Sequence, residues 1–165
     1  LSTGKSTLVG ACTGLVAGLV VITPAAGFVE TWAALIMGIV VSPICYFCVS
    51  RLKYKLGYDD ALDAFGCHCI GGIVGGILTG VFCVPELSWT DFGGLLYTGD
   101  PSLLISQILG IVVTIVFVGL MTLILGFIVK KCFGGSLALT GYDEAKGMDV
   151  AQHGESAYPA FDGLD

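Results

Sequence analysis

Four long apolar stretches constrain the fold of this chain more than any other feature. A helix needs about 20 residues to cross the hydrocarbon core of a bilayer; the first two stretches are shorter than this and the last is longer, which helix tilt accommodates. The stretches are residues 8–23, 33–49, 61–84 and 103–129. Of the 165 residues, 55% are hydrophobic and 12% are charged, which is not typical of a water-soluble domain. We therefore predict an all-α, polytopic transmembrane helix bundle with four spans over residues 1–133, followed by a polar tail over residues 134–165.

The charged residues predict the orientation of these spans. With four spans, all seven Lys and Arg residues fall on one side of the membrane, and the positive-inside rule makes that side cytoplasmic. The two opposite loops, residues 24–32 and 85–102, contain acidic residues and no Lys or Arg. Both ends of the chain and the tail are thus expected in the cytoplasm. The net charge of −6 argues against a nucleic-acid partner.

Glycines recur at four-residue intervals in two of the spans. In a bilayer, small residues let helix backbones approach closely and gain dispersion contacts. We expect these glycines to pack the first and third spans into the interior of the bundle. They are Gly10, Gly14 and Gly18 in the first span and Gly72, Gly76 and Gly80 in the third.

A histidine in the middle of the third span, His68, is the first candidate functional residue. An ionisable side chain inside a bilayer is costly unless it faces protein or water, and it commonly marks a solute pathway. We expect the ring to be uncharged, with one donor and one acceptor nitrogen. Phe65 and Gly72 lie about one turn to either side, and the glycine leaves space beside the ring. The pattern favours a pore wall, and a structural histidine bonded to a neighbouring helix remains the alternative.

Two acidic residues, Asp60 and Asp63, stand at the beginning of the third span. Carboxylates at this position are expected to accept hydrogen bonds from free N–H groups and to complement the helix dipole. A second role remains open, because carboxylates at the cytoplasmic mouth of a pore would attract cations.

The seven cysteines lie mostly within the apolar spans, as expected for small, reduced packing residues. A membrane redox or metal-binding protein is the alternative, although the set lacks the second ligand pair of a zinc site. That alternative would use Cys45, Cys48, Cys67, His68 and Cys69. Replacing the five cysteines that do not flank His68 would distinguish the two hypotheses. We predict a protein that is not an enzyme and that needs no metal and no cofactor.

Several motifs in the third span and the tail resemble one family. Residues 59–72, DDALDAFGCHCIGG, resemble the tenth helix of the ammonium transporter (Amt/Mep/Rh) family, whose pattern is D-D-x-x-D-x-F-x-x-H-G-x-G-G. Residues 23–27, TPAAG, resemble the turn between the eighth and ninth helices of that family, and residues 4–7, GKST, resemble the preceding loop. Cys69 stands where the family usually has glycine. The tail resembles the family's C-terminal signature at Gly147, Met148, Asp149, His153, Gly154, Glu155, Ala157 and Tyr158.

The resemblance implies that the chain corresponds to helices eight to eleven and the cytoplasmic tail of an eleven-helix transporter of the plasma (inner) membrane. Such proteins are homotrimers with one pore per subunit. His68 would be one of two pore histidines, with its partner on a helix that this chain lacks. Ammonium, or methylammonium as its analogue, would lose its proton outside, cross a narrow apolar pore and be reprotonated inside. The tail would bind a PII-type regulatory protein or couple the subunits. A non-conducting, truncated membrane remnant is the remaining alternative.

Overall fold

The computed structural model of the chain describes residues 7–155, and these form helices and no β-strand, which confirms the all-α prediction. Helical turns of other types extend or connect several of the α-helices. The α-helices are α1 (Leu8–Ile22), α2 (Thr31–Phe47), α3 (Lys53–Leu56), α4 (Ile70–Phe82), α5 (Leu95–Thr98), α6 (Ser102–Cys132) and α7 (Gly141–Lys146). The 3₁₀ turns are η1 (Thr23–Ala25) and η4 (Pro85–Leu87), and the π-turns are η2 (Cys48–Leu52), η3 (Phe65–Cys69) and η5 (Asp149–His153).

Within the described residues, four helical segments are long and apolar enough to cross a membrane, as predicted. They are Leu8–Ala25, Thr31–Leu56, Phe65–Phe82 and Ser102–Cys132. Two of their ends lie four or more residues from the expected ones. The second segment continues past residue 49 to Leu56 because a π-turn carries it onward, and the third begins at Phe65 and not at residue 61 because the preceding acidic residues form a turn.

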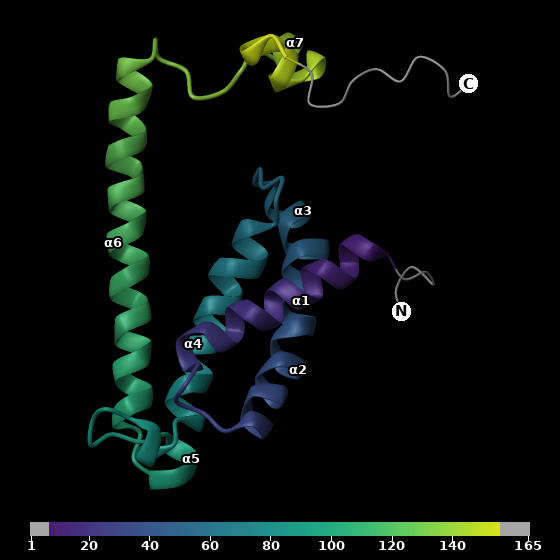
Figure 1. Cartoon of the computed structure of the whole chain (residues 1–165). Helices are drawn as coiled ribbons and strands as arrows, with labels where there is room; N and C mark the ends of the chain where they lie inside the picture. The colour runs from purple at the N-terminus through teal and green to yellow at the C-terminus, as the bar shows by residue number, and fades with distance from the viewer. Residues whose placement is uncertain (1–6, 156–165) are drawn as a thin grey trace. The chain divides into compact units, whose positions relative to one another are not determined.

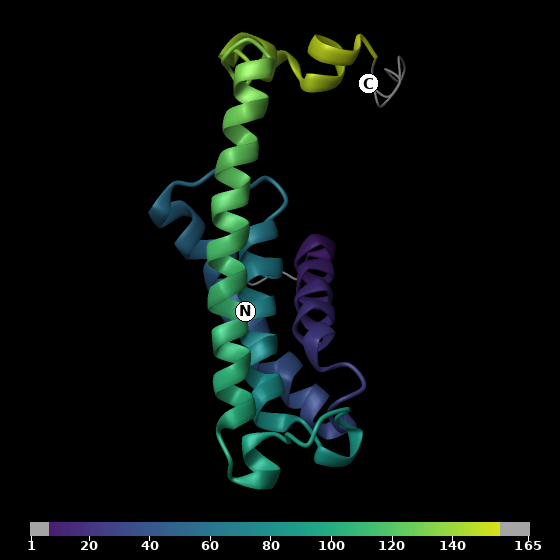
Figure 2. The same cartoon turned by 90° about the vertical axis from the view of Figure 1, so that its left-hand side faces the viewer.

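The chain divides into two compact units, Leu1–Ile115 and Val116–Asp165. The boundary between them lies within α6. In the first unit, α1, α2 and α4 pack against one another (Figure 1 and Figure 2). In the second unit, the end of α6 is followed by α7, whose N-cap Thr140 accepts a hydrogen bond from the backbone N–H of Asp143 at 3.3 Å. The division into a membrane domain of residues 1–133 and a cytoplasmic tail stays a prediction.

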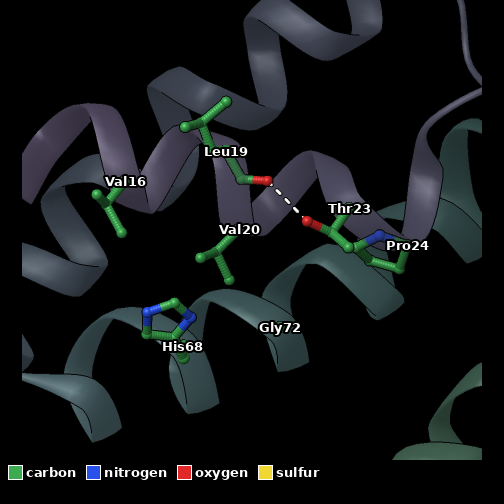
Figure 3. A pocket seen from close by; sticks show the side chains of 7 residues that line it. All are labelled: Val16, Leu19, Val20, Thr23, Pro24, His68 and Gly72. Atoms are coloured by element: carbon green, nitrogen blue, oxygen red, sulfur yellow. Dashed lines mark hydrogen bonds between the residues drawn. The ribbon is translucent and has the colours of Figure 1, made fainter.

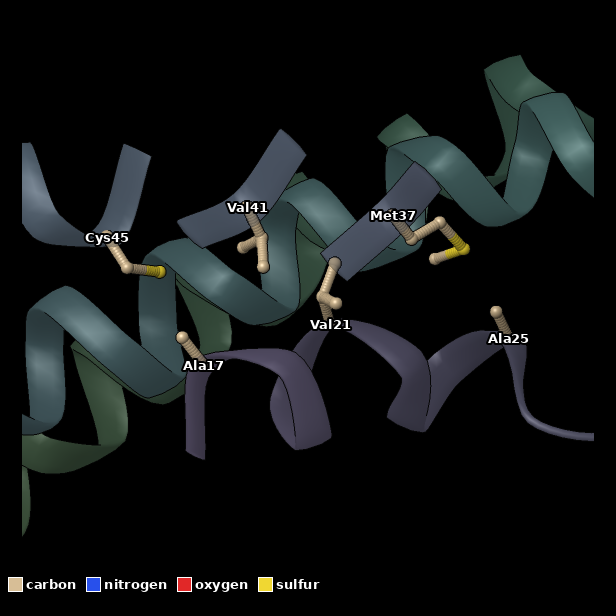
Figure 4. Close-up of a cluster of buried hydrophobic side chains, with 6 residues drawn as sticks. All are labelled: Ala17, Val21, Ala25, Met37, Val41 and Cys45. Carbon is tan, nitrogen blue, oxygen red and sulfur yellow. The ribbon is translucent and has the colours of Figure 1, made fainter. Parts of the chain in front are cut away.

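The core of the first unit consists of small and medium apolar side chains that recur every four residues. Residues four apart lie on the same face of a helix, so each helix presents one narrow buried stripe. Figure 4 shows the side chains of α1 and η1 pointing toward those of α2. The stripes consist of Ala17, Val21 and Ala25 on one side and Met37, Val41 and Cys45 on the other, all at most 2% exposed. This packing fixes the position of α1 beside α4, where the candidate site lies.

Candidate functional site

His68 lies in the π-turn η3, at the start of the third membrane-spanning segment and not in its middle as expected, because that segment begins at Phe65. The ring of His68 faces α1 (Figure 3). It borders an open, mostly apolar recess of about 520 Å³ between the two helices. The recess is lined by Val16, Leu19, Val20, Thr23, Pro24, His68 and Gly72. A second recess of about 330 Å³, also bordered by Val16 and His68, extends toward the start of α1. The imidazole therefore lies between two hollows along the face of α1.

The imidazole is exposed on this part of the chain. Within residues 7–155 it makes no hydrogen bond or ion pair. A structural histidine bonded to a neighbouring helix therefore finds no partner among the described helices. A ring in this position keeps both nitrogens available to a solute or to a further helix.

The direction of the His68 ring follows from the π-turn. The backbone N–H of Ile70 donates to the carbonyl of Phe65, five residues earlier, so the turn holds one residue more than an α-turn. On the opposite side, a Cβ added to Gly66 would lie 2.7 Å from Cγ2 of Val49, so only glycine allows this close packing onto η2. With Gly66 packed against η2, His68 faces α1. Such π-turns are frequent at functional sites.

The two predicted neighbours of His68 differ in position. Gly72 lines the same recess, and nothing lies within 4 Å of a Cβ added there, so the space beside the ring is open. Phe65 does not line it, and its ring makes an edge-to-face contact with Tyr58 at a centroid distance of 5.3 Å. The structure thus brings His68 and Gly72 together and places Phe65 elsewhere.

The two predicted acidic residues have separate contacts. The carboxylate of Asp60 accepts hydrogen bonds from the backbone N–H groups of Ala64 at 2.9 Å and Phe65 at 2.8 Å. These are the bonds of a helix cap. Asp63 instead forms an ion pair with Lys53 at 2.8 Å. A role of either carboxylate in attracting cations stays a prediction.

The cysteines are all free thiols, and Cys45, Cys48 and Cys67 are buried. In the part of the chain that the structure describes, no group of three or more His, Cys, Asp or Glu side chains is arranged to hold a metal ion. The alternative metal site, which also included Cys69, therefore has no support from the geometry.

The glycines of α4 contact two different helices. Cβ atoms added to Gly76 and Gly80 would meet Ile111 at 3.0 Å and the Cα of Leu104 at 2.7 Å, both on α6. Gly71 and Gly75 face α1 instead. On α1 the predicted stripe behaves differently. No described atom lies within 4 Å of a Cβ added to Gly14 or Gly18, and Gly10 meets only Thr7 of its own helix cap. Packing by the α1 glycines stays a prediction.

The tail signature lies around the end of α7 and the turn η5. Gly147 follows α7 with a φ of 93°, and Gly154 follows η5 with a φ of 66°, both in the region that favours glycine. Between them, Asp149 begins η5 and His153 ends it, and the carbonyl of Asp149 accepts a hydrogen bond from Glu155. Tyr158, like residues 4–6 of the GKST motif, lies outside the described residues.

The sequence alone did not reveal which side chains of α1 face His68. It also did not reveal which residue pairs with Asp63. The TPAAG motif was the available signal for the first, because its Thr23 and Pro24 line the recess. Two features of the sequence could have indicated the partner of Asp63. Lys53 lies ten residues before it, and Gly57, with a φ of 68°, lets the chain turn back between them.

Comparison with known proteins decides the family. Residues 1–158 match the sequence profile described as Ammonium Transporter Family. The chain belongs to the ammonium transporter family. Its apolar helices and its family identify it as an integral membrane protein.

The sequences of individual ammonium transporters align with most of this chain. The ammonium transporter of Bacillus subtilis is 47% identical over 154 residues, which cover 93% of this chain and 37% of that protein. The ammonium transporter of Aquifex aeolicus is 44% identical over 158 residues, covering 96% of this chain and 36% of that protein. The crystal structure of Saccharomyces cerevisiae Mep2 matches with a TM-score of 0.71 at 34% identity, over 96% of this chain and 36% of that chain. The chain therefore spans less than two fifths of the length of these ammonium transporters.

Proposed function

We propose that this chain forms part of a protein that moves ammonium across a membrane, and that His68 lines the pore. The observation that carries the proposal is the exposed imidazole within a membrane-spanning segment, beside an apolar recess that Gly72 keeps open. Membership of the ammonium transporter family supports the choice of solute. Methylammonium is the analogue that such a pore would also admit.

The mostly apolar lining of the recess favours transfer of neutral ammonia over transfer of the ammonium cation. Moving a full charge from water into a low-dielectric environment costs several kcal/mol per ion even after relaxation. Ammonia avoids this cost if the proton is removed before entry and returned after exit. A neutral imidazole can donate and accept hydrogen bonds at the same time and can relay a proton near neutral pH. His68 would fill this role together with groups on helices that complete the pore.

We also propose which part of the whole transporter this chain forms. The chain would supply the last four of eleven helices of a homotrimeric transporter in the plasma (inner) membrane, with the C-terminal tail in the cytoplasm. The chain spans 36–37% of the length of these relatives, which supports the proposal that the whole transporter contains further helices. The helix α6 has no buried residue, which supports contact with lipid or with further protein.

The tail is the proposed site of regulation. We propose that residues 134–165 bind a PII-type regulatory protein, and a binding assay on protein truncated after residue 133 tests this. The described part of this tail consists of short turns, with positive φ at Gly147 and Gly154.

The test is His68→Ala in the full-length gene product, expressed in cells that lack their own ammonium transporters. Because the ring is the one titratable side chain among the described residues that line the larger recess, we expect selective methylammonium uptake to fall by about 100-fold, in the range of a lost acid–base group. The trimer should remain intact in detergent. Ser106→Ala is the matched control, since its hydroxyl only bonds to the carbonyl of Ser102 on its own helix at 2.9 Å. Unchanged uptake and selectivity in His68→Ala would refute the role.

A further inference from the structure

Lys53 and Asp63 form the one ion pair that the structure records within residues 7–155, with Nζ 2.8 Å from Oδ1. Nζ of Lys53 also donates a hydrogen bond to the backbone carbonyl of Asp60. The two side chains are only 20% and 28% exposed, so water and salt screen the pair less than they screen a surface pair. The ion pair thus ties the end of the second membrane-spanning segment to the turn that begins the third.

The backbone of Asp63 determines where the third segment starts. Its φ is 55°, the one positive value among the described non-glycine residues, and Asp is one of the few side chains that tolerate this region. Its carbonyl accepts the backbone N–H of Cys67 at 2.9 Å, which is the first helical hydrogen bond of the segment. A change in the position of Asp63 would therefore change the start of the helix.

The π-turn that carries His68 begins two residues after Asp63. Successive residues of a helix are about 100° apart around its axis, because one turn takes 3.6 residues. If the π-turn gained or lost its extra residue, His68 would rotate away from the recess by about this angle. A neighbouring side chain, Cys67 or Cys69, would then face α1 in its place.

Lys53 itself follows a second π-turn, η2, and the two π-turns lie against each other. The backbone N–H of Lys53 donates to the carbonyl of Cys48, five residues earlier, and Val49 of η2 contacts Gly66 of η3. The Lys53–Asp63 ion pair closes the end of this contact. Both irregular turns are thus held in register by one ion pair.

We propose that Lys53 and Asp63 are positioning residues for transport, which set the register of η3 and so direct the ring of His68 into the recess. This inference rests on the proposed function. In this proposal the pair acts on transport through the direction of the imidazole.

The experiment compares variants of the full-length gene product by the ratio of methylammonium uptake to rubidium uptake, measured per molecule in the membrane. Lys53→Met and Asp63→Asn should each lower this ratio by about tenfold or more, as His68→Ala does. Lys53→Arg keeps the positive charge and the hydrogen-bond donor and leaves the backbone of Asp63 unchanged, so its ratio should stay within about threefold of the parent. Lys55→Met is the matched control, because Lys55 is an exposed lysine two residues further on, and its ratio should not change.

The outcomes separate this inference from the proposed function. If His68→Ala leaves the ratio unchanged, the proposed function is wrong. If His68→Ala lowers the ratio while Lys53→Met only reduces the amount of protein in the membrane, the pair is merely structural and the inference alone is wrong. If Lys53→Met does not reach the membrane, Asp63→Glu replaces it, since the added methylene shifts the carboxylate and keeps the charge. A normal amount of Asp63→Glu with a lowered ratio supports the inference, and an unchanged ratio overturns it.

Discussion

The carboxylate of Glu30 joins two loops that lie far apart in the sequence. It accepts hydrogen bonds from Nε1 of Trp32 at 2.5 Å and from the phenol of Tyr97 at 2.8 Å. These bonds, from Trp32 first and then Tyr97, hold the pKa of Glu30 below its ordinary value, because they stabilise the ionised form. The bond to Glu30 likewise raises the pKa of Tyr97. The connection between the loops therefore requires an ionised Glu30 and a protonated Tyr97.

The two pKa shifts predict how this connection depends on pH. A lowered pKa in the folded protein gives stability that is present above the ordinary glutamate pKa of about 4.3 and is lost as the pH falls through the lowered value. A raised tyrosine pKa gives stability that is present below about pH 10 and is lost as the pH rises through the raised value. Tyr97→Phe should therefore lower the melting temperature in detergent at pH 7 and make it less sensitive to acid. Tyr142→Phe, at an exposed position of α7, is the control. An identical acid response in Tyr97→Phe and the parent would contradict this account.

Residue types in the sequence were enough to select His68 and to expect a capping carboxylate at Asp60, but not to find the partners of these side chains. A charged or polar residue inside a span is conspicuous by itself, whereas its contacts depend on the fold. Lys53 illustrates the limit, since nothing in the sequence separates it from Lys55 until the turn at Gly57 brings it to Asp63. The direction of the His68 ring was also not predictable, because a π-turn has no marked composition of its own.

At the scale of elements, α4 is the helix whose glycines make the closest contacts. A Cβ added to Gly75 would overlap the backbone carbonyl oxygen of Val21 and would lie 2.9 Å from Cγ of Pro24. Backbone cannot move aside as the end of a flexible side chain can. The contact therefore sets the spacing between α1 and α4, and with it the width of the recess beside His68.

Replacing Gly75 by alanine should separate these two helices. We expect Gly75→Ala to destabilise the folded protein by about 1–3 kcal/mol, the usual cost of overpacking a core. Gly38→Ala on α2 is the matched control, because nothing described lies within 4 Å of the added methyl and alanine has the higher helix propensity. Unfolding in a denaturing detergent series measures both. Equal stability of the two variants would mean that the α1–α4 contact is looser than the structure indicates.

The small-residue pattern predicted close helix packing but not which helices meet. Gly76 and Gly80, four residues apart on one face of α4, contact α6, whereas Gly75, about 100° further round the helix, contacts α1. A stripe of this kind carries no information about its partner. The start of the third span was displaced because hydropathy averages over the turn at Asp60 and Asp63. The end of the second span was displaced because the helix continues through the π-turn η2 to Leu56.

At the scale of the whole molecule, the fold class and the family follow from sequence, because apolar length and motif order survive without any knowledge of contacts. Four apolar segments and no strand among the described residues agree with the predicted helix bundle, and the family match covers residues 1–158. The recess beside His68 is not contained in this pattern. It is bordered by α1, η1, η3 and α4, and we propose that further helices would complete its wall.

A structure of the full-length gene product would test the proposed pore. We expect a continuous narrow passage that crosses the membrane beside the imidazole nitrogens of His68, with Thr23 and Gly72 still lining it. An imidazole enclosed by side chains of the added helices, with no passage beside it, would refute the proposed role of His68.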